Sequence, residues 1–217
     1  MGKKLIEKLN HMYPKFIEGG KANGHDPKAL EKIWNDWRAF ASYAFNKSHA
    51  TCYSWVAYQT AYLKANYPSQ YMAGVMSRSL ADINTVAKLM DECKTMGIST
   101  LGPDINESYL KFSVTHQGDI RFGMGAVKGV GEAAVMEIIN ERKKHGPYQS
   151  VYDLVERVNL TTCNKKSLES LALAGAFDSC GNIPREAYVE PDERGNTFLD
   201  QLVRYGNRYQ TDQAENS

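Results

Sequence analysis

The chain has 217 residues, which is enough for one large domain or two small ones. Hydrophobic residues make up 42% of it and the formal net charge is +1, so it can bury a core but carries no general basic field. Any contact with nucleic acid must therefore come from local positive charge. No apolar run is long enough to span a bilayer, and we expect no membrane partner.

The four cysteines are widely spaced and form no pattern typical of a metal site. No C-x-x-C occurs, and no cysteine lies near a histidine at the spacing of zinc ligands. Cys52 lies in an apolar segment and is predicted to be a small core residue. We therefore expect no metal site and a reducing, cytoplasmic location.

The first 44 residues are predicted to form two helices. Residues 1–20 combine a basic start with apolar residues at the spacing of a short amphipathic helix. Residues 24–44 form the second helix, with Asp26 as N-cap and Pro27 at the first helical position. Apolar residues at helical spacing predict the buried side of this helix: Leu30, Ile33, Trp34, Trp37, Phe40 and Ala41.

A long helix is predicted over residues 45–68, and its start is unusual. Asn46 and Ser48 are good N-caps, but Lys47 and His49 place cations against the helix dipole. Because a helix N-terminus presents free amides, a polyanion bound there explains the two cations better than local stability does. The alternative is a core helix whose Lys47 and His49 simply reach solvent.

The body of this helix is apolar on nearly every side, which is typical of a helix buried within a helical domain. We expect its charged tip to be exposed in a cleft. Two shorter helices are predicted next, over residues 69–79 and 85–96, and Gly97 ends the second of them.

Residues 98–123 change character. Residues 101–104 are predicted to form a turn. Side chains then alternate with period two over 110–114 and 120–122, and Gly118 lies between these runs. The pattern predicts a small β-hairpin.

Residues 125–146 carry a second functional signal, because apolar-Lys-Gly-apolar-Gly followed by a helix resembles a helix-hairpin-helix motif. Glycines let the backbone turn tightly and approach a partner, so that amides of the turn can face one phosphate. Such contacts do not depend on base sequence. The alternative is a plain glycine turn between two helices. The candidate DNA-binding residues are Val127, Lys128, Gly129, Val130 and Gly131.

A second helix-loop-helix is predicted over residues 150–180. Its loop lacks the G-x-G pattern, so we expect a degenerate or purely structural hairpin that supports the first. Lys165 and Lys166 could contact phosphate, but a solvated helix start is the simpler interpretation. Residues 182–217 are polar; we expect one short helix near 198–205 and disorder from Gln210 onward.

Several short blocks follow one another in a specific order along the chain. They are FNKSHA at 45–50, Tyr53, Tyr58-Gln59, Leu63-Lys64, Tyr67-Pro68, Asp91-Glu92-Cys93, Met96-Gly97, PDIN at 103–106 and GAVKGVG at 125–131. Together they resemble the fingers domain and following region of the bacterial replicative DNA polymerase III alpha subunit, over roughly Met1 to Cys180.

The resemblance implies a mainly α fold and a fragment of a larger enzyme. It implies helical fingers over 1–100, a β-hairpin connection over 101–124, a tandem helix-hairpin-helix module over 125–181 and a polar, partly disordered tail over 182–217.

The resemblance also implies template-directed DNA synthesis by the parent protein, a DNA-directed DNA polymerase. Lys47, Ser48 and His49, with Tyr53 one turn further in, are then expected to hold the triphosphate of the incoming deoxynucleotide. Mg²⁺ is expected on carboxylates of a palm domain that has no match here, so the fragment is expected to bind but not catalyse. The implied partners are primer–template DNA, with the sliding clamp and other replisome subunits held by regions outside this chain.

Two further hypotheses stay open at this point. The chain is a standalone DNA-binding module with helix-hairpin-helix repeats, in which case Lys47, Ser48 and His49 are incidental. Or it is a helical domain that binds only other proteins. Binding to DNA that weakens with salt distinguishes the last hypothesis from the other two, and dependence on nucleotide distinguishes those two from each other.

Overall fold

The computed structural model describes the backbone of residues 6–43 and 47–215 and the side chains of 8–40 and 48–215. Contacts along the chain define two compact units, residues 1–59 and 60–217. The described residues are mainly helical with one small sheet, which confirms the predicted fold class.

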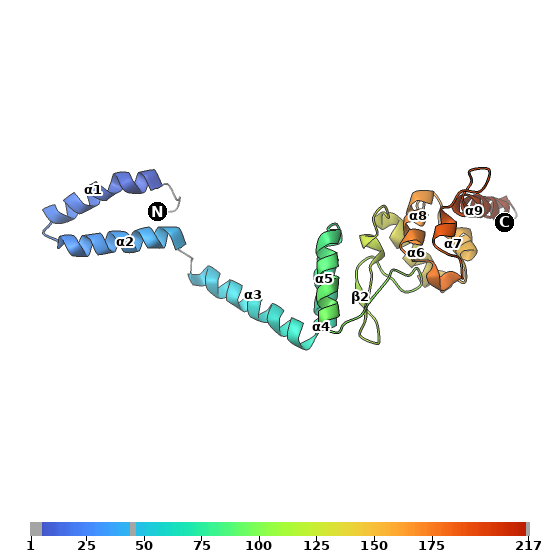
Figure 1. Ribbon diagram of the computed structural model, residues 1–217, viewed down its shortest axis with the longest axis horizontal. Coiled ribbons are helices and arrows are strands. Elements are labelled where there is room, and N and C mark those ends of the chain that lie inside the picture. The colour runs from blue at the N-terminus through green and yellow to red at the C-terminus, as the bar shows by residue number, and fades with distance from the viewer. Residues whose placement is uncertain (1–5, 44–46, 216–217) are drawn as a thin grey trace. The chain divides into compact units, whose positions relative to one another are not determined.

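The first unit contains an antiparallel pair of helices, α1 (Ile6–Ala22) and α2 (Pro27–Tyr43) (Figure 1). The Asp26 carboxylate accepts a hydrogen bond from the amide of Lys28 at 3.2 Å, so Asp26 caps α2 as predicted. The helices pack closely at Gly20, where a Cβ atom would lie 2.4 Å from the Leu30 side chain. Glycine at this position allows the two backbones to approach.

Only part of the predicted buried side of α2 is covered. Leu30 and Trp34 are buried, and the Trp34 ring lies 5.4 Å from the ring of Tyr13 and 5.3 Å from that of Phe16. The remaining large apolar side chains of the stripe are exposed by 41–64%: Ile33, Trp37 and Phe40. Two helices alone cover one face of each other, so the wide stripe exceeds the contact surface that α1 provides.

The long helix α3 (Lys47–Asn66) begins in the first unit and ends in the second. Its existence and its end before Pro68 were predicted, but its burial was not predicted correctly. Every residue from 48 to 63 is exposed, including Cys52, which was expected in a core. An apolar helix is buried only where another surface covers it, and sequence pattern does not say which polypeptide supplies that surface.

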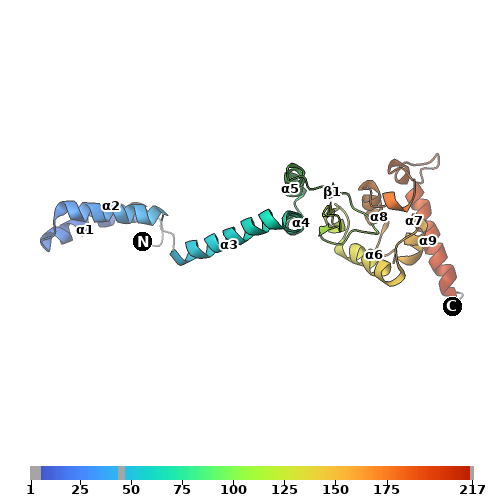
Figure 2. The same cartoon turned by 90° about the horizontal axis from the view of Figure 1, so that it is seen from below.

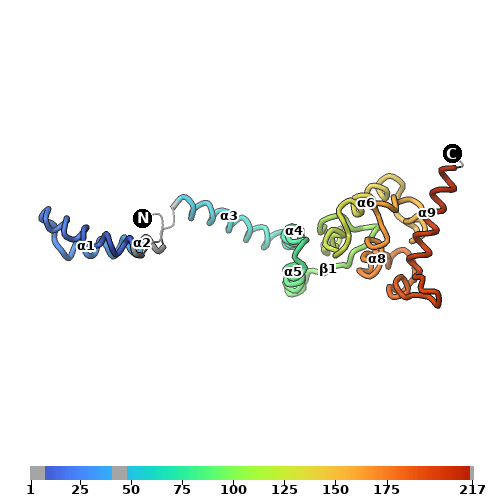
Figure 3. The backbone as a smooth tube through the Cα atoms, turned by 90° about the horizontal axis from the view of Figure 1, so that it is seen from above, coloured from blue at the N-terminus to red at the C-terminus, as the bar shows by residue number. Residues whose placement is uncertain are grey.

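The second unit begins with α4 (Pro68–Arg78) and α5 (Ile83–Thr95), which pack against each other (Figure 3). Asp82 caps α5 by accepting a hydrogen bond from the amide of Thr85 at 3.1 Å. These helices and the sheet enclose a small core of Met72, Ala73, Met76, Val86, Cys93, Phe112, Ile120 and Ala126.

The sheet consists of β1 (Thr100–Leu101), β2 (Ser113–Val114) and β3 (Ile120–Arg121) in the order β1-β3-β2. The antiparallel pair of β2 and β3 confirms the predicted hairpin. The turn predicted at residues 101–104 is corrected at its first residue, because Leu101 belongs to β1, which pairs with β3 in parallel. This pairing joins segments about twenty residues apart, and a local pattern does not reveal it.

The remaining helices form a larger core. They are α6 (Glu132–His145), α7 (Val151–Arg157), α8 (Lys165–Leu173) and α9 (Phe198–Glu215), with short 3₁₀ turns at η1 (Met124–Ala126), η2 (Asp178–Cys180) and η3 (Glu186–Tyr188). Figure 2 shows α9 beside α7, and the two helices are in contact. Side chains that are almost fully buried hold these elements together, among them Ile138, Leu154, Leu168, Leu171, Leu199 and Leu202.

The tail prediction is wrong, because α9 extends to Glu215 where disorder was expected from Gln210. The Gln210 side-chain amide donates to the carbonyl oxygens of Val155 and Val158 at 2.8 and 2.9 Å. A Cβ atom at Gly206 would lie 2.7 Å from the Val155 carbonyl oxygen, so α9 approaches α7 closely there. These contacts depend on polar and small residues, which a hydrophobicity pattern does not register as packing.

Candidate nucleic-acid interface

The candidate DNA-binding residues lie in one turn between η1 and α6. The Val130 amide donates to the Val127 carbonyl oxygen at 3.2 Å and closes the turn. Gly129 has φ +89°, a conformation that favours glycine, so the predicted need for glycine is confirmed at this position. Val127 and Val130 are half-buried, while Lys128, Gly129 and Gly131 are exposed.

The start of α6 has no side-chain cap. Its N-cap is Gly131, in extended backbone, and among the described residues this cap position makes no side-chain hydrogen bond to the first turn. By contrast, Ser150 accepts from the amide of Asp153 at 3.1 Å to cap α7, and Asn164 caps α8. Uncapped amides next to an exposed lysine are the geometry that a phosphate group requires.

The two glycines of the turn differ in their surroundings. A Cβ atom on Gly129 would lie 2.7 Å from the Ser170 hydroxyl oxygen of α8, whereas a Cβ atom on Gly131 would meet nothing within 4 Å. Gly129 is therefore required by the packing of the turn on α8. Gly131 is the position where a larger side chain would change the exposed surface without a clash.

The second helix-loop-helix is present as predicted, with α7 and α8 joined by residues 158–164. The amides of its loop are bonded within the loop: the Asn159 side chain accepts from the amides of Thr161 and Thr162 at 2.9 and 3.1 Å. The Asn159 carbonyl oxygen accepts from the amide of Cys163 at 2.8 Å. This turn is closed internally, in contrast to the turn at Gly129.

Buried polar contacts position the first hairpin, and pattern reasoning missed them. Arg142 of α6 is 9% exposed and donates to the carbonyl oxygens of Ile105 and Ser108. Partial burial lowers the pKa of its guanidinium, although the nearby Tyr109 opposes this effect. The sequence signal closest to these contacts is the PDIN block at 103–106, which contributes to the family resemblance but does not itself predict a contact with Arg142.

A side-chain amide joins that block to the turn after α6. The Asn106 side chain accepts from the Tyr148 amide at 2.8 Å and donates to the Tyr148 carbonyl oxygen at 2.9 Å. The Arg157 guanidinium lies 4.4 Å from the Tyr148 ring and donates to the Gly146 carbonyl oxygen at 2.9 Å. The C-terminal end of α6 is thus fixed from two sides.

The candidate nucleotide-binding residues lie at the start of α3. The side chain of Lys47 lies outside the described residues, as does Asn46. Ser48, His49 and Tyr53 are exposed, and the ring centroids of His49 and Tyr53 lie 4.3 Å apart. The structure thus brings two of the predicted residues together on one side of the helix.

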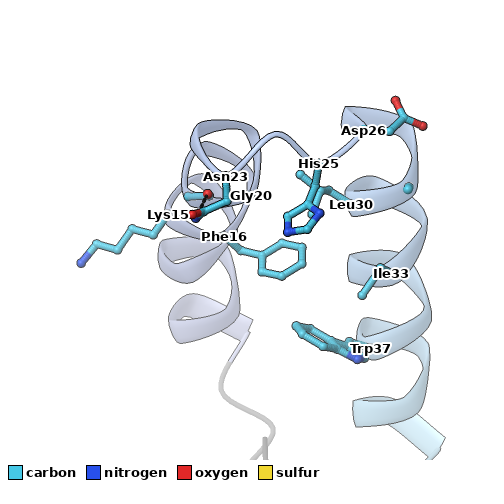
Figure 4. Close-up of a pocket in the computed structure, with 11 residues that line it drawn as sticks. Lys15, Phe16, Gly20, Asn23, His25, Asp26, Leu30, Ile33 and Trp37 are labelled. Carbon is cyan, nitrogen blue, oxygen red and sulfur yellow. Dashed lines mark hydrogen bonds between the residues drawn. The ribbon is translucent and has the colours of Figure 1, made fainter.

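A groove in the first unit lies between α1 and α2 and has a volume of about 560 Å³ (Figure 4). Its large apolar lining residues are Phe16, Leu30, Ile33 and Trp37, and its polar ones are Lys15, Asn23, His25 and Asp26. This apolar lining suits hydrophobic side chains and not a phosphate group.

The described residues also bear on metals and membranes. No three or more side chains of His, Cys, Asp and Glu in residues 8–40 and 48–215 are grouped so that they could hold a metal ion. Within the part of the chain that the structure describes, no helix has both the length and the apolar character needed to cross a bilayer.

The fold and the turn include a helix-hairpin-helix region, and a family model described as "Helix-hairpin-helix motif" matches residues 97–187. Over a longer stretch, the chain is homologous to part of the DNA polymerase III subunit alpha. The subunit of Mycobacterium tuberculosis is 44% identical over 199 residues, which is 92% of this chain and 17% of that protein.

Other relatives carry the same name and are similarly long. The Chlamydia trachomatis subunit is 47% identical over 82% of this chain, and the Vibrio cholerae subunit is 42% identical over 83%. The chain spans 14% of the first and 16% of the second. It therefore corresponds to about a sixth of each relative.

Proposed function

We propose that this chain supplies duplex-DNA and incoming-nucleotide contacts to template-directed DNA synthesis, as a segment of a bacterial replicative DNA polymerase. The observation that carries the proposal is the uncapped start of α6 beside Lys128, inside the helix-hairpin-helix match and within a chain homologous to DNA polymerase III subunit alpha. The whole enzyme is a DNA-directed DNA polymerase acting in the cytoplasm.

The DNA contact uses the backbone of the turn. Amides of Gly131 and the first turn of α6 face one phosphate, and the Lys128 ammonium adds a charge beside them. Val130 packs against the core, and its amide bonds to the Val127 carbonyl oxygen, which holds the turn in place. Because phosphates carry no base information, binding is independent of sequence.

The nucleotide contact lies at the tip of α3. Lys47, Ser48 and His49 hold the triphosphate, and Tyr53 borders the sugar or base. The first turn of α3 contains no acidic residue, so nothing in it repels an anion. The close His49–Tyr53 ring contact supports a shared surface for one ligand.

Mg²⁺ and the other partners belong to the parent enzyme. Among the described residues, no three or more side chains of His, Cys, Asp and Glu are grouped so that they could hold a metal ion. We place the metal on palm carboxylates outside this segment, and the sliding clamp and other replisome subunits on regions outside it. Primer–template DNA and a deoxynucleoside triphosphate are the ligands of this segment.

The DNA contact is tested by titrating the chain with a fluorescent duplex of mixed sequence over a range of salt. Log K should fall with log salt by roughly 0.9 per phosphate contact. Lys128→Ala should weaken binding and Glu132→Gln should strengthen it, because Glu132 places an opposing charge in the first turn of α6. A DNA affinity that changes neither with salt nor with either substitution would mean that the hairpin does not contact DNA.

A glycine pair provides a test that does not alter charge. Gly131 has φ −79° and ψ 152°, which valine adopts readily, so Gly131→Val should keep the fold and cover the uncapped amides. Gly102 also has open space at its Cβ position and precedes Pro103, so Gly102→Val is the matched control. Only the first variant should lose DNA affinity.

The nucleotide contact needs the longer enzyme. In a full-length polymerase carrying this segment, Lys47→Ala should lower nucleotide affinity and the incorporation rate together, with DNA affinity unchanged. Pre-steady-state incorporation measures both effects. An unchanged rate and nucleotide Kd would favour the alternative of a DNA-binding module without a polymerase role.

A further inference from the structure

The start of α8 lies directly beside the first hairpin. Ser170 of α8 borders Gly129, since its hydroxyl oxygen would be 2.7 Å from a Cβ atom there. Just before α8, the Cys163 thiol donates to the carbonyl oxygen of Ala134, in the first turn of α6, at 3.5 Å. Residues 163–170 therefore run alongside both the turn and the uncapped helix start.

Helical spacing places Lys166 on the same side of α8. It precedes Ser170 by four residues within α8, and residues at this separation are neighbours on a helix surface. Ser167, the next residue, is 5% exposed. The Lys166 side chain, in contrast, is exposed to solvent.

The two lysines at the start of α8 differ in their partners. The Lys165 ammonium lies 2.7 Å from a carboxylate oxygen of Asp200 in α9. Among the described residues, Lys166 has no ion-pair partner. Of these two lysines, Lys166 is the one whose ammonium stays available for a ligand next to the hairpin.

The loop of the second hairpin cannot provide a phosphate site of its own kind. Its Thr161, Thr162 and Cys163 amides already donate to Asn159, and the Asn164 side chain occupies the amide of Ser167 at 3.0 Å. These four amides are therefore not available to a phosphate group, and an exposed side chain offers the contact instead.

We propose that Lys166 makes a second phosphate contact beside that of the Gly129 turn, so that the second hairpin joins the DNA interface through one ammonium and not through its loop. This inference rests on the proposed DNA-binding function. It assigns a role to a residue that the sequence pattern treats as a solvated helix start, and it makes one composite site from both hairpins.

The test compares neighbouring lysines in the complete chain, titrated with fluorescent mixed-sequence duplex DNA at several salt concentrations. Lys166→Ala should weaken binding several-fold and reduce the magnitude of the salt slope by about one contact. Lys165→Ala should stay close to wild type, because its ammonium is already paired with Asp200. Lys166→Arg should restore the affinity and the slope.

The outcomes separate this inference from the function on which it rests. If Lys128→Ala weakens binding while Lys166→Ala equals wild type, the hairpin binds DNA and the Lys166 contact is wrong. Equal losses for Lys165→Ala and Lys166→Ala would also overturn it, because general charge would then explain both. If the wild-type chain shows no salt-dependent binding, the proposed function fails first. Circular dichroism of each variant establishes that the fold is retained.

Discussion

Gly129 and Gly131 stand two residues apart, yet the structure requires glycine only at the first. Gly129 combines φ +89° with the nearby Ser170 hydroxyl. Gly129→Ala should therefore lower the free energy of unfolding by about 1–3 kcal/mol, whereas Gly131→Ala should cost less than about 1 kcal/mol. Urea unfolding followed by circular dichroism measures both. Equal losses would contradict the difference in backbone strain.

This difference changes how the hairpin must be probed. A branched side chain at Gly129 would strain the turn and press on Ser170. Lost DNA binding in such a variant could then come from a damaged fold as well as from a lost DNA contact. Gly131 has the open surroundings that a binding test needs.

The cysteines provide a second residue-scale prediction. Cys52 is exposed, while Cys93, Cys163 and Cys180 are buried, and burial raises the pKa of the Cys163 thiol to about 12. Because the thiolate is the reactive form, a thiol reagent at neutral pH should react quickly with Cys52 alone. The thiols of Cys93, Cys163 and Cys180 should react only after denaturant unfolds the chain.

Substitution of the exposed cysteine checks the assignment. Cys52→Ser should abolish the fast reaction without changing the slow one. Fast labelling that persists in this variant would mean that one of the three other thiols is accessible in the folded chain.

At the scale of elements, the contact between α8 and α9 predicts a pH effect. The Lys165 ammonium, followed by the Thr197 amide and hydroxyl, lowers the pKa of Asp200 to about 2. A lowered pKa stabilises the fold above the ordinary value of 3.8 and this contribution disappears as the pH falls through about 2. Lys165→Ala should raise the pKa of Asp200 toward its ordinary value.

Carboxyl NMR titration of Asp200 at low salt measures this shift directly. The stability difference between wild type and Lys165→Ala should be constant near neutral pH and shrink as Asp200 becomes protonated. A pKa of Asp200 that is the same in both proteins would mean that Lys165 does not pair with it in solution.

The elements that the sequence predicts well are those with local signals. Gly97 as a stop and the alternation over 110–114 and 120–122 each act within a few residues, so the end of α5 and the β2–β3 hairpin follow from pattern. The start of α6 follows Gly131 for the same reason. These signals depend on backbone preferences that need no distant partner.

The elements that were missed depend on partners far along the chain. The β1 strand exists because the Ile120 amide donates to the Ser99 carbonyl oxygen at 2.9 Å, and the end of α9 is held by Gln210 on α7. In the candidate interface, the exposed Lys128 was predicted, but the neighbouring Ser170 was not. Gly129 and Ser170 are about forty residues apart, and a contact over that distance leaves no periodic pattern in either segment.

At the scale of the whole molecule, the two units differ in how much apolar surface they bury. Among the described side chains of residues 1–59, only Leu30 and Trp34 are buried hydrophobic residues. The second unit contains two buried clusters. Since buried apolar area is the main source of stability, the first unit should unfold more easily than the second.

The three tryptophans make this difference measurable. Trp34, Trp37 and Trp55 all lie within residues 1–59, so tryptophan fluorescence reports the first unit alone. Circular dichroism reports helices of both units, most of which lie in the second. In urea, the fluorescence transition should therefore come at lower concentration than the main loss of helix signal, which is non-two-state behaviour for the chain.

A simplified variant sharpens this measurement. Trp37 and Trp55 are 43% and 64% exposed, so replacing both with Phe leaves Trp34, which is 6% exposed, as the single probe. Its emission should shift to the red at the early transition, because water reaches the indole once α1 separates from α2. Coincident fluorescence and circular dichroism curves in this variant would mean that the units unfold together, and that the small α1–α2 core is stabilised by more than its own buried side chains.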